Sequence, residues 1–292
     1  MRSQGFSIHQ VLIAIIAPGL FVPNIHAQSL ARVRQKVQHS SGSSPSRNRV
    51  KSSGGRRSDY GGTADSVCDD DDNPFEELLG YAFLAAASAP FVVPRVALDD
   101  NGETGYFADY PYDHDGGVKN VAYEPNLAGL HRSTFVIQGS FGQDFNDLSN
   151  AQGRIFGDYR SRWGIDSEFY YRHENTRGGN DELWNGDFNL TYRFAQNENW
   201  QFRAGVGVNW LTDEFDSDAG INSTYSVEWF PGDPYVLTGL IDWGRIGDTS
   251  LFHFRTTAGI THNGWGTFTG YDVTRISDET IHAWINGIEY RF

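Results

Sequence analysis

The sequence predicts an all-β fold: a transmembrane β-barrel of about ten antiparallel strands, preceded by a disordered linker and one short helix. Two observations support this prediction. Residues 131–292 consist of segments in which apolar and polar side chains alternate with a period of two, and in "WQFRAGVGVNW", residues 200–210, the alternation has no exception. The connections between these segments are short on one side and longer on the other, an asymmetry typical of membrane barrels.

Ten segments show this alternation, and each of them ends in turn residues. An even number of strands suits a closed antiparallel barrel, and the segment ends leave room for about eight to twelve. The least regular segment is the ninth, in which Phe268 falls on the opposite face from Tyr271 and Val273. The ten segments are residues 132–145, 152–163, 165–171, 188–194, 200–210, 221–230, 235–243, 251–261, 265–275 and 280–292.

The apolar face of these strands is predicted to face lipid. Trp200 and Trp210 lie ten residues apart on the same face. At about 3.4 Å per residue and a tilt near 40°, they are separated by a height of roughly 26 Å. That height matches the apolar band between the two aromatic girdles of a membrane barrel. The predicted girdle residues are Trp200, Trp210, Trp229 and Tyr290.

The polar face carries arginines and carboxylates on neighbouring strands, and lysine is almost absent after Lys51. Solvated sheet faces usually use lysine, whereas the planar guanidinium suits close pairing with carboxylates inside a barrel. A barrel of this size is narrow enough for such side chains to fill much of its interior. The predicted lumen and constriction residues are Arg154, Arg160, Arg162, Asp166, Glu168, Arg172, Asp187, Arg193 and Arg203.

The chain ends in "WINGIEYRF", with Ile288, Tyr290 and Phe292 on one face of the last segment. This ending resembles the C-terminal targeting strand of bacterial outer-membrane β-barrel proteins, and the resemblance covers residues 131–292. It implies that the barrel assembly machinery recognises these three residues and that outer-membrane lipids surround the barrel. The resemblance names a class of proteins and no subfamily.

The N-terminus predicts export. Arg2 precedes the apolar run "VLIAIIAPGLFV", residues 11–22, which is too short to span a bilayer as a stable helix, and Ala27 follows in a suitable position for cleavage. We expect a signal peptide at residues 1–27, cleaved after Ala27; an uncleaved anchor is the alternative. Residues 28–72 form a basic linker that is expected to be disordered. Such a linker suits contact with an anionic envelope polymer, or is plain solvated chain.

Residues 73–130 are expected to hold one short helix and an irregular segment. Asn73 as N-cap and Pro74 at the first helical position start a helix that we expect to end near Ser88, before the next proline. The stretch that follows is rich in Gly, Pro, Asp and Tyr, with room for a strand near residues 91–96.

Charge and cysteine content narrow the classes of function. Residues 1–60 carry nine Lys or Arg and one acid, which leaves fourteen bases and thirty-six acids for the rest of the chain. An acidic fold disfavours binding to nucleic acid. The single cysteine, Cys68, excludes an intrachain disulfide. We expect no cofactor and no metal, because the acidic stretch from Asp213 to Asp218 does not match the spacing of a calcium-binding loop.

The sequence leaves three functions open. The first, which we favour, is an outer-membrane barrel with a structural role or with porin-like passage of small solutes through a charged lumen. The second is an outer-leaflet enzyme, of the protease or lipid-hydrolase type, for which His253 and Asp242 are the available acid–base pair on adjacent strands. No serine nucleophile motif accompanies them. The third is a soluble secreted β-sandwich.

Overall fold

The computed structural model describes residues 30, 32–33, 74–108, 110–112, 118, 120–123, 129–144, 148–176, 179–213 and 217–292. The predicted signal peptide lies outside the described residues, and so does nearly all of the predicted linker.

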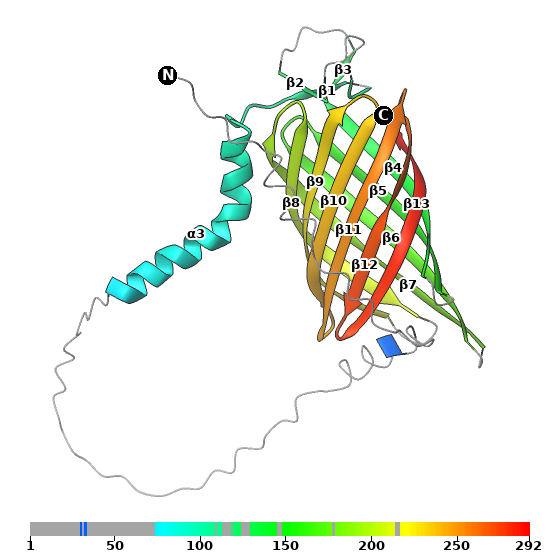
Figure 1. The fold of residues 1–292 in the computed structure, drawn as a ribbon. Coiled ribbons are helices and arrows are strands. Elements are labelled where there is room, and N and C mark those ends of the chain that lie inside the picture. Colours follow the sequence, from blue (N-terminus) through cyan, green and yellow to red (C-terminus); the bar gives the residue numbers. More distant parts are fainter. Residues whose placement is uncertain are drawn as a thin grey trace, which may run out of the picture.

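Ten strands close into one barrel, in which each strand pairs antiparallel with its neighbour in sequence and β13 pairs with β4 (Figure 1). This confirms the predicted fold class, and each of the ten predicted segments forms one strand. The strands are β4 Ser133–Gln143, β5 Leu148–Tyr159, β6 Trp163–Thr176, β7 Gly179–Gln196, β8 Trp200–Thr212, β9 Ser217–Gly232, β10 Tyr235–Ile246, β11 Thr249–His262, β12 Trp265–Ile276 and β13 Glu279–Arg291.

The two ends of the barrel differ. We call the end that holds Phe292 and the β5–β6, β7–β8, β9–β10 and β11–β12 turns the C-terminal end, and the opposite end the far end. The predicted long loops of the far end are mostly strand: β6 and β7 remain paired as far as Thr176 and Gly179. Backbone pairing continues beyond the alternating segments because polar residues outside the apolar band form ladder hydrogen bonds equally well.

The faces of the strands are sorted as the membrane interpretation requires. On β8, Val206 is 66% exposed on the outside, while Arg203 is 4% exposed on the inside. On the neighbouring strand β7, Tyr192 is exposed and Arg193 is fully buried. A soluble β-sandwich would bury the apolar set and expose the arginines. The closed barrel therefore rules out the β-sandwich alternative.

Aromatic side chains form two groups on the outside of the barrel. At the C-terminal end, Trp200 stacks on Trp229 with ring centroids 4.9 Å apart, and Tyr290 lies 4.8 Å from Trp265. Towards the far end, Trp210 lies on the same face of β8, ten residues along the strand. All four predicted girdle residues are therefore on the outer surface, at two levels.

The helix α3, Pro74–Ala97, is longer than predicted, and the prediction of a strand near residues 91–96 was wrong. The helix continues past Pro90 and Pro94, although each proline removes one backbone donor and is a frequent helix stop. Its C-terminal half runs beside the outer wall of the barrel (Figure 1). There the rings of Phe91 and Phe194 pack edge to face, with their centroids 5.2 Å apart. Among the described residues, no helix combines the length and the apolarity needed to cross a membrane.

The segment between α3 and the barrel closes the C-terminal end. It contains a small antiparallel sheet of β1 Tyr106–Ala108, β2 Val121–Ala122 and β3 Leu130–His131, which the sequence did not predict. Phe107 on β1 is 1% exposed, and the guanidinium of Arg193 lies 4.7 Å from the centre of its ring.

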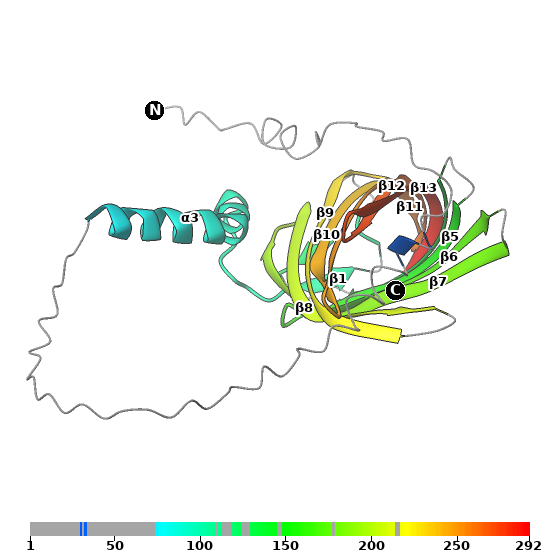
Figure 2. The same cartoon turned by 90° about the horizontal axis from the view of Figure 1, so that it is seen from below.

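A second cap lies at the far end. Leu30, Arg32 and Val33 are helical, and Leu30 and Val33 are almost completely buried among aliphatic side chains of the barrel mouth. This segment lies inside the outline of the barrel in Figure 2. The prediction of a disordered linker is therefore wrong for these three residues. Leu30 and Val33 are ordered because they pack against aliphatic side chains at the mouth of the folded barrel. The barrel side chains that surround them, which we call the aliphatic ring, are Leu148, Leu183, Leu211, Ile246, Leu251, Ile276 and Ile281.

Candidate functional site

The centre of the lumen holds a cluster of ionisable side chains around His253. In the barrel register His253 on β11 lies directly opposite Asp242 on β10, and its Nδ1 is 2.8 Å from Asp242 Oδ2. On the other side of the ring, Nε2 lies 3.0 Å from Asp272 Oδ2 and 3.1 Å from the Tyr170 hydroxyl. The two nitrogens of this buried imidazole therefore both face carboxylates.

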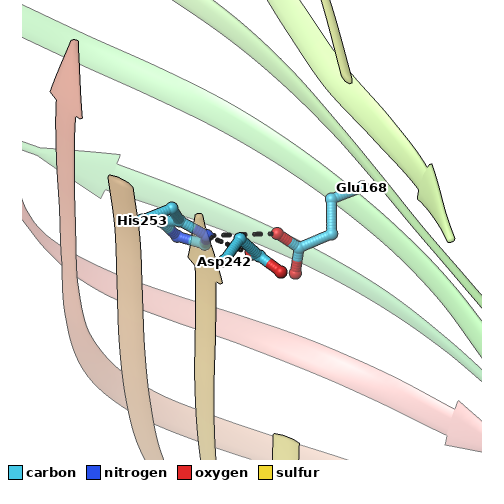
Figure 3. Close-up of side chains that lie close together, drawn as sticks. All are labelled: Glu168, Asp242 and His253. Atoms are coloured by element: carbon cyan, nitrogen blue, oxygen red, sulfur yellow. Dashed lines mark hydrogen bonds and ion pairs between the residues drawn. The ribbon is translucent and has the colours of Figure 1, made fainter. Parts of the chain in front are cut away.

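Glu168 connects this cluster to two arginines, since its Oε1 lies 3.3 Å from Arg154 Nε and 2.8 Å from Arg255 Nη1. Its Oε2 lies 3.7 Å from His253 Nδ1 (Figure 3), and its Oε1 accepts a hydrogen bond from Arg255 Nη1. Arg154 binds Asp166 through two parallel hydrogen bonds of 2.9 and 2.6 Å. Bidentate pairs of this kind are short and directional, so they fix the positions of both side chains.

Glu168, Asp242 and His253 each offer one ligand atom, and these atoms lie within 4.8 Å of one another (Figure 3). The geometry nevertheless favours a hydrogen-bonded unit over a metal centre. A metal ligand needs a free nitrogen lone pair on the imidazole, and both nitrogens of His253 already face carboxylate oxygens. A ring that donates from both nitrogens satisfies Asp242 and Asp272 together.

A second cluster fills the half of the lumen nearer the C-terminal end. Arg203 Nη2 lies 2.7 Å from Asp158 Oδ2 and 2.6 Å from Glu228 Oε2. Arg291 reaches the other oxygen of Glu228 at 2.8 Å, and Arg193 lies 3.4 Å from Asp158. Each carboxylate in this cluster therefore serves two arginines.

Two of the predicted lumen arginines lie elsewhere. Arg160 and Arg162 occupy the β5–β6 turn at the C-terminal end, because the strand alternation stops at Tyr159. The Arg162 guanidinium binds Asp100 through contacts of 2.7 and 2.6 Å. Arg160 stacks on Tyr106, with its guanidinium carbon 4.7 Å from the ring centre. Both arginines thus hold the capping segment to the barrel.

The pairing with Arg162 also sets the ionisation of Asp100. Burial alone would raise the pKa of this carboxyl, but the hydrogen bonds and the charge of Arg162, with backbone donors from Gly102 and Gln196, hold the pKa below its usual value. Asp100 is therefore a charged anchor for the cap at neutral pH.

The two remaining predicted lumen residues lie inside the barrel but outside these pairs. Arg172 contacts the Asn185 side chain and donates to Thr274 Oγ1 at 2.9 Å. Asp187 accepts a hydrogen bond from Asn189 at 2.8 Å. Both are buried, and their contacts are with neutral groups.

The structure also includes ionisable lumen residues that the sequence analysis did not single out. They include Asp158, Tyr170, Glu228, Arg255, Asp272 and Arg291. Most lie at polar positions of the alternating strands, so their inward direction could be deduced. Their partners could not, because Arg255 and Glu168 come from strands that are not neighbours in the barrel order.

The last strand is placed as the resemblance implies. Ile288, Tyr290 and Phe292 are all exposed on the outer face. The backbone of Phe292 exchanges two hydrogen bonds with Phe135, of 2.7 and 2.9 Å, and so completes the closure of β13 onto β4.

A closed antiparallel barrel of ten strands, apolar outside and charged inside, has the architecture of bacterial outer-membrane β-barrels. The class-level resemblance is confirmed. The barrel architecture identifies no subfamily.

No family model matches the sequence, and no curated protein matches it. Among solved structures, a KdgM porin is 10% identical with a TM-score of 0.31, over 55% of this chain and 99% of that one. The outer membrane protein OprG from Pseudomonas aeruginosa is 10% identical with a TM-score of 0.31, over 55% and 95%. The outer membrane protein Ail from Yersinia pestis is 13% identical with a TM-score of 0.29, over 55% and 98%.

Proposed function

We propose that this chain is an outer-membrane barrel whose lumen is closed by its own side chains, with a structural role or with passage of small solutes only after the closure is released. The observation that carries the proposal is the reversal of polarity across the wall. Val206 and Val208 face outward, 66% and 53% exposed, while Arg203 on the same strand is 4% exposed inside. In a membrane, lipid surrounds the apolar outer face, and the charges on the inner face neutralise one another in ion pairs.

Closure of the lumen argues against an open pore. The arginine–carboxylate clusters cross the interior from wall to wall: Arg255 on β11 reaches Glu168 on β6, and Arg203 on β8 reaches Asp158 on β5. A cavity that remains in the centre has a volume of about 10 Å³, roughly enough for one water molecule. Passage of a solute requires these ion pairs to separate.

The outer-leaflet enzyme is less well supported. His253 and Asp242 form the predicted pair at 2.8 Å, but they are 4% and 2% exposed in the middle of the lumen. A general base must come within hydrogen-bond reach of its substrate, and this position offers a substrate no open path. We therefore favour a structural role for the pair, which joins β10 to β11 and β12.

Conductance across a planar lipid bilayer tests the proposal. The refolded wild type should show no steady conductance, because the arginine–carboxylate clusters cross the lumen from wall to wall. The double variant Arg203→Ala, Arg255→Ala should open brief channel events. Arg245→Ala is the matched control, since Arg245 is exposed on the outside of β10, and it should behave like the wild type. A steady open current from the wild type would contradict a closed lumen.

Export and assembly belong to the same proposal. Cleavage after Ala27 predicts a mature chain that begins at Gln28, which intact-mass spectrometry of the purified membrane fraction checks. Removal of Phe292 should reduce assembly into the membrane, because it deletes both an aromatic outer residue and the backbone pairing with Phe135. Binding of the basic residues 28–72 to an anionic envelope polymer is the remaining proposed contact.

A further inference from the structure

Asp187 is a buried carboxylate that forms no ion pair with any described residue. It is 8% exposed, and its hydrogen-bond partner is the neutral amide of Asn189. In the barrel register it lies directly between Glu168 on β6 and Asn209 on β8. Like charges opposite one another on neighbouring strands destabilise a sheet, and a buried charge is costly unless it is paired. No cationic side chain in the described part of the chain forms an ion pair with Asp187.

The charges of the central cluster do not balance. Counting every ionisable arginine and histidine there as a cation leaves one negative charge in excess. One of these cations, Arg172, contacts the neutral side chains of Asn185 and Thr274. The carboxylates are Asp166, Glu168, Asp187, Asp242 and Asp272, and the cations are Arg154, Arg172, His253 and Arg255.

A second observation concerns Asn209, which lies next to these carboxylates. Asn209 is 2% exposed, and neither atom of its side-chain amide has a hydrogen-bond partner among the described residues. Asn209, Asp187 and Asp242 line the same central cavity of about 10 Å³. A buried amide without partners is uncommon, because leaving its polar atoms unsatisfied costs free energy. The cavity has room for one small ion with these three side chains as its ligands.

We propose that this cavity binds one hard cation of the calcium type. Its ligands are a carboxylate oxygen of Asp187, a carboxylate oxygen of Asp242 and the amide oxygen of Asn209. Asp242 uses Oδ2 for His253, which leaves Oδ1 for the ion. Calcium prefers oxygen ligands and tolerates irregular geometry, whereas magnesium demands a near-ideal octahedral arrangement of its ligands. A divalent cation more than balances the single excess negative charge, and it satisfies the amide oxygen of Asn209.

This site shares Asp242 with the Glu168, Asp242 and His253 trio, but it does not use the imidazole. It also extends beyond the proposed function, because a lumen cation lies inside the barrel whether or not solutes pass. Its role is to join β7, β8 and β10 across the lumen.

The test is the metal content of the refolded barrel. The wild type, folded in detergent with CaCl2 and then desalted exhaustively, should retain one calcium per chain by mass spectrometry, and MgCl2 should not replace it. Asp187→Asn and Asn209→Leu should each lose the ion and also lose the calcium-dependent rise in the thermal midpoint. The matched control is the double variant Asp213→Asn, Asp218→Asn, which removes two acids beside the β8–β9 connection and should retain the ion.

Three results would overturn the site. The first is a wild type without calcium after refolding. The second is calcium that survives Asp187→Asn but is lost in the Asp213→Asn, Asp218→Asn control, which would assign it to the acidic connection. The third is a metal-free wild type that Asp187→Asn stabilises, which would show that a proton on Asp187 supplies the missing charge. If Asp187→Asn fails to fold, Asn209→Leu decides, because it keeps every charge.

Discussion

Arg203 Nη2 and Glu228 Oε2 lie 2.6 Å apart inside the barrel, on neighbouring strands, and each side chain is 4% exposed. The residues directly before and after Arg203 on β8, Phe202 and Ala204, face outward, so the strand separates a dry ion pair from an apolar exterior.

Breaking this pair should destabilise the barrel strongly. Glu228→Gln leaves Arg203 and Arg291 short of a carboxylate in a buried site, and removing one partner of a buried pair typically costs about 3–5 kcal/mol. The measurement is the free energy of unfolding in urea. Glu182→Gln at the far end is the control, since its side chain is 55% exposed, and it should leave the unfolding curve unchanged. A small effect of Glu228→Gln would mean that water reaches the cluster.

A charge on the outer wall should be costly in the middle of the belt and tolerated at its edge. Val206→Arg places a guanidinium among acyl chains and should lower the free energy of unfolding from vesicles by about 2–4 kcal/mol. Ser250→Arg, at an exposed position at the far end, should cost about 0–1 kcal/mol. Equal and small costs at both positions would indicate an exterior in contact with water.

Acid should loosen the cap at the C-terminal end. The folded-state pKa of Asp100 is held below its ordinary value, so the stability from the Arg162 contact is fully present above the unfolded pKa of about 3.9 and is lost as the pH falls through the folded value. Pepsin cleavage within residues 98–131 should therefore accelerate below about pH 4.

Asp100→Asn supplies the comparison for this cap. The amide does not titrate, so cleavage of the variant should be fast at every pH where pepsin is active. A wild type and variant with identical cleavage rates at pH 5 would show that the Asp100 and Arg162 pair does not hold the cap.

The far cap should open when its apolar side chains are replaced. Leu30→Asp with Val33→Asp removes two buried aliphatic side chains, each contributing about 1.5–3 kcal/mol when fully buried. In a Cys68→Ser background, a thiol at Leu251→Cys should react with a water-soluble maleimide about tenfold faster or more in the double variant. A thiol at Ile285→Cys, outside this cap, should not change.

Much of the barrel could be predicted from the sequence, because strand alternation determines which face each side chain occupies. Arg193 and Arg203 were placed inside and Trp200 outside from parity alone, and His253 and Asp242 were placed side by side from adjacent strands. The structure agrees on all of these positions.

The misplaced features depend on contacts between distant parts of the chain. Leu30 and Val33 are isolated apolar residues in a polar stretch. The aliphatic ring that they pack against is formed by residues from seven different strands. Arg162 follows the last alternating residue by a few positions, so parity no longer applies to it. Helix α3 passes two prolines that a local rule takes as stops.

The most direct test of the central claim uses the eight tryptophans, which all lie on the outer wall of the barrel. Trp163, Trp243 and Trp284 are about half exposed there. Refolded into vesicles of lipids brominated along their acyl chains, the protein should lose most of its tryptophan fluorescence relative to unbrominated vesicles. Fluorescence that bromine leaves unchanged, with the protein recovered in buffer without detergent, would contradict a barrel surrounded by lipid.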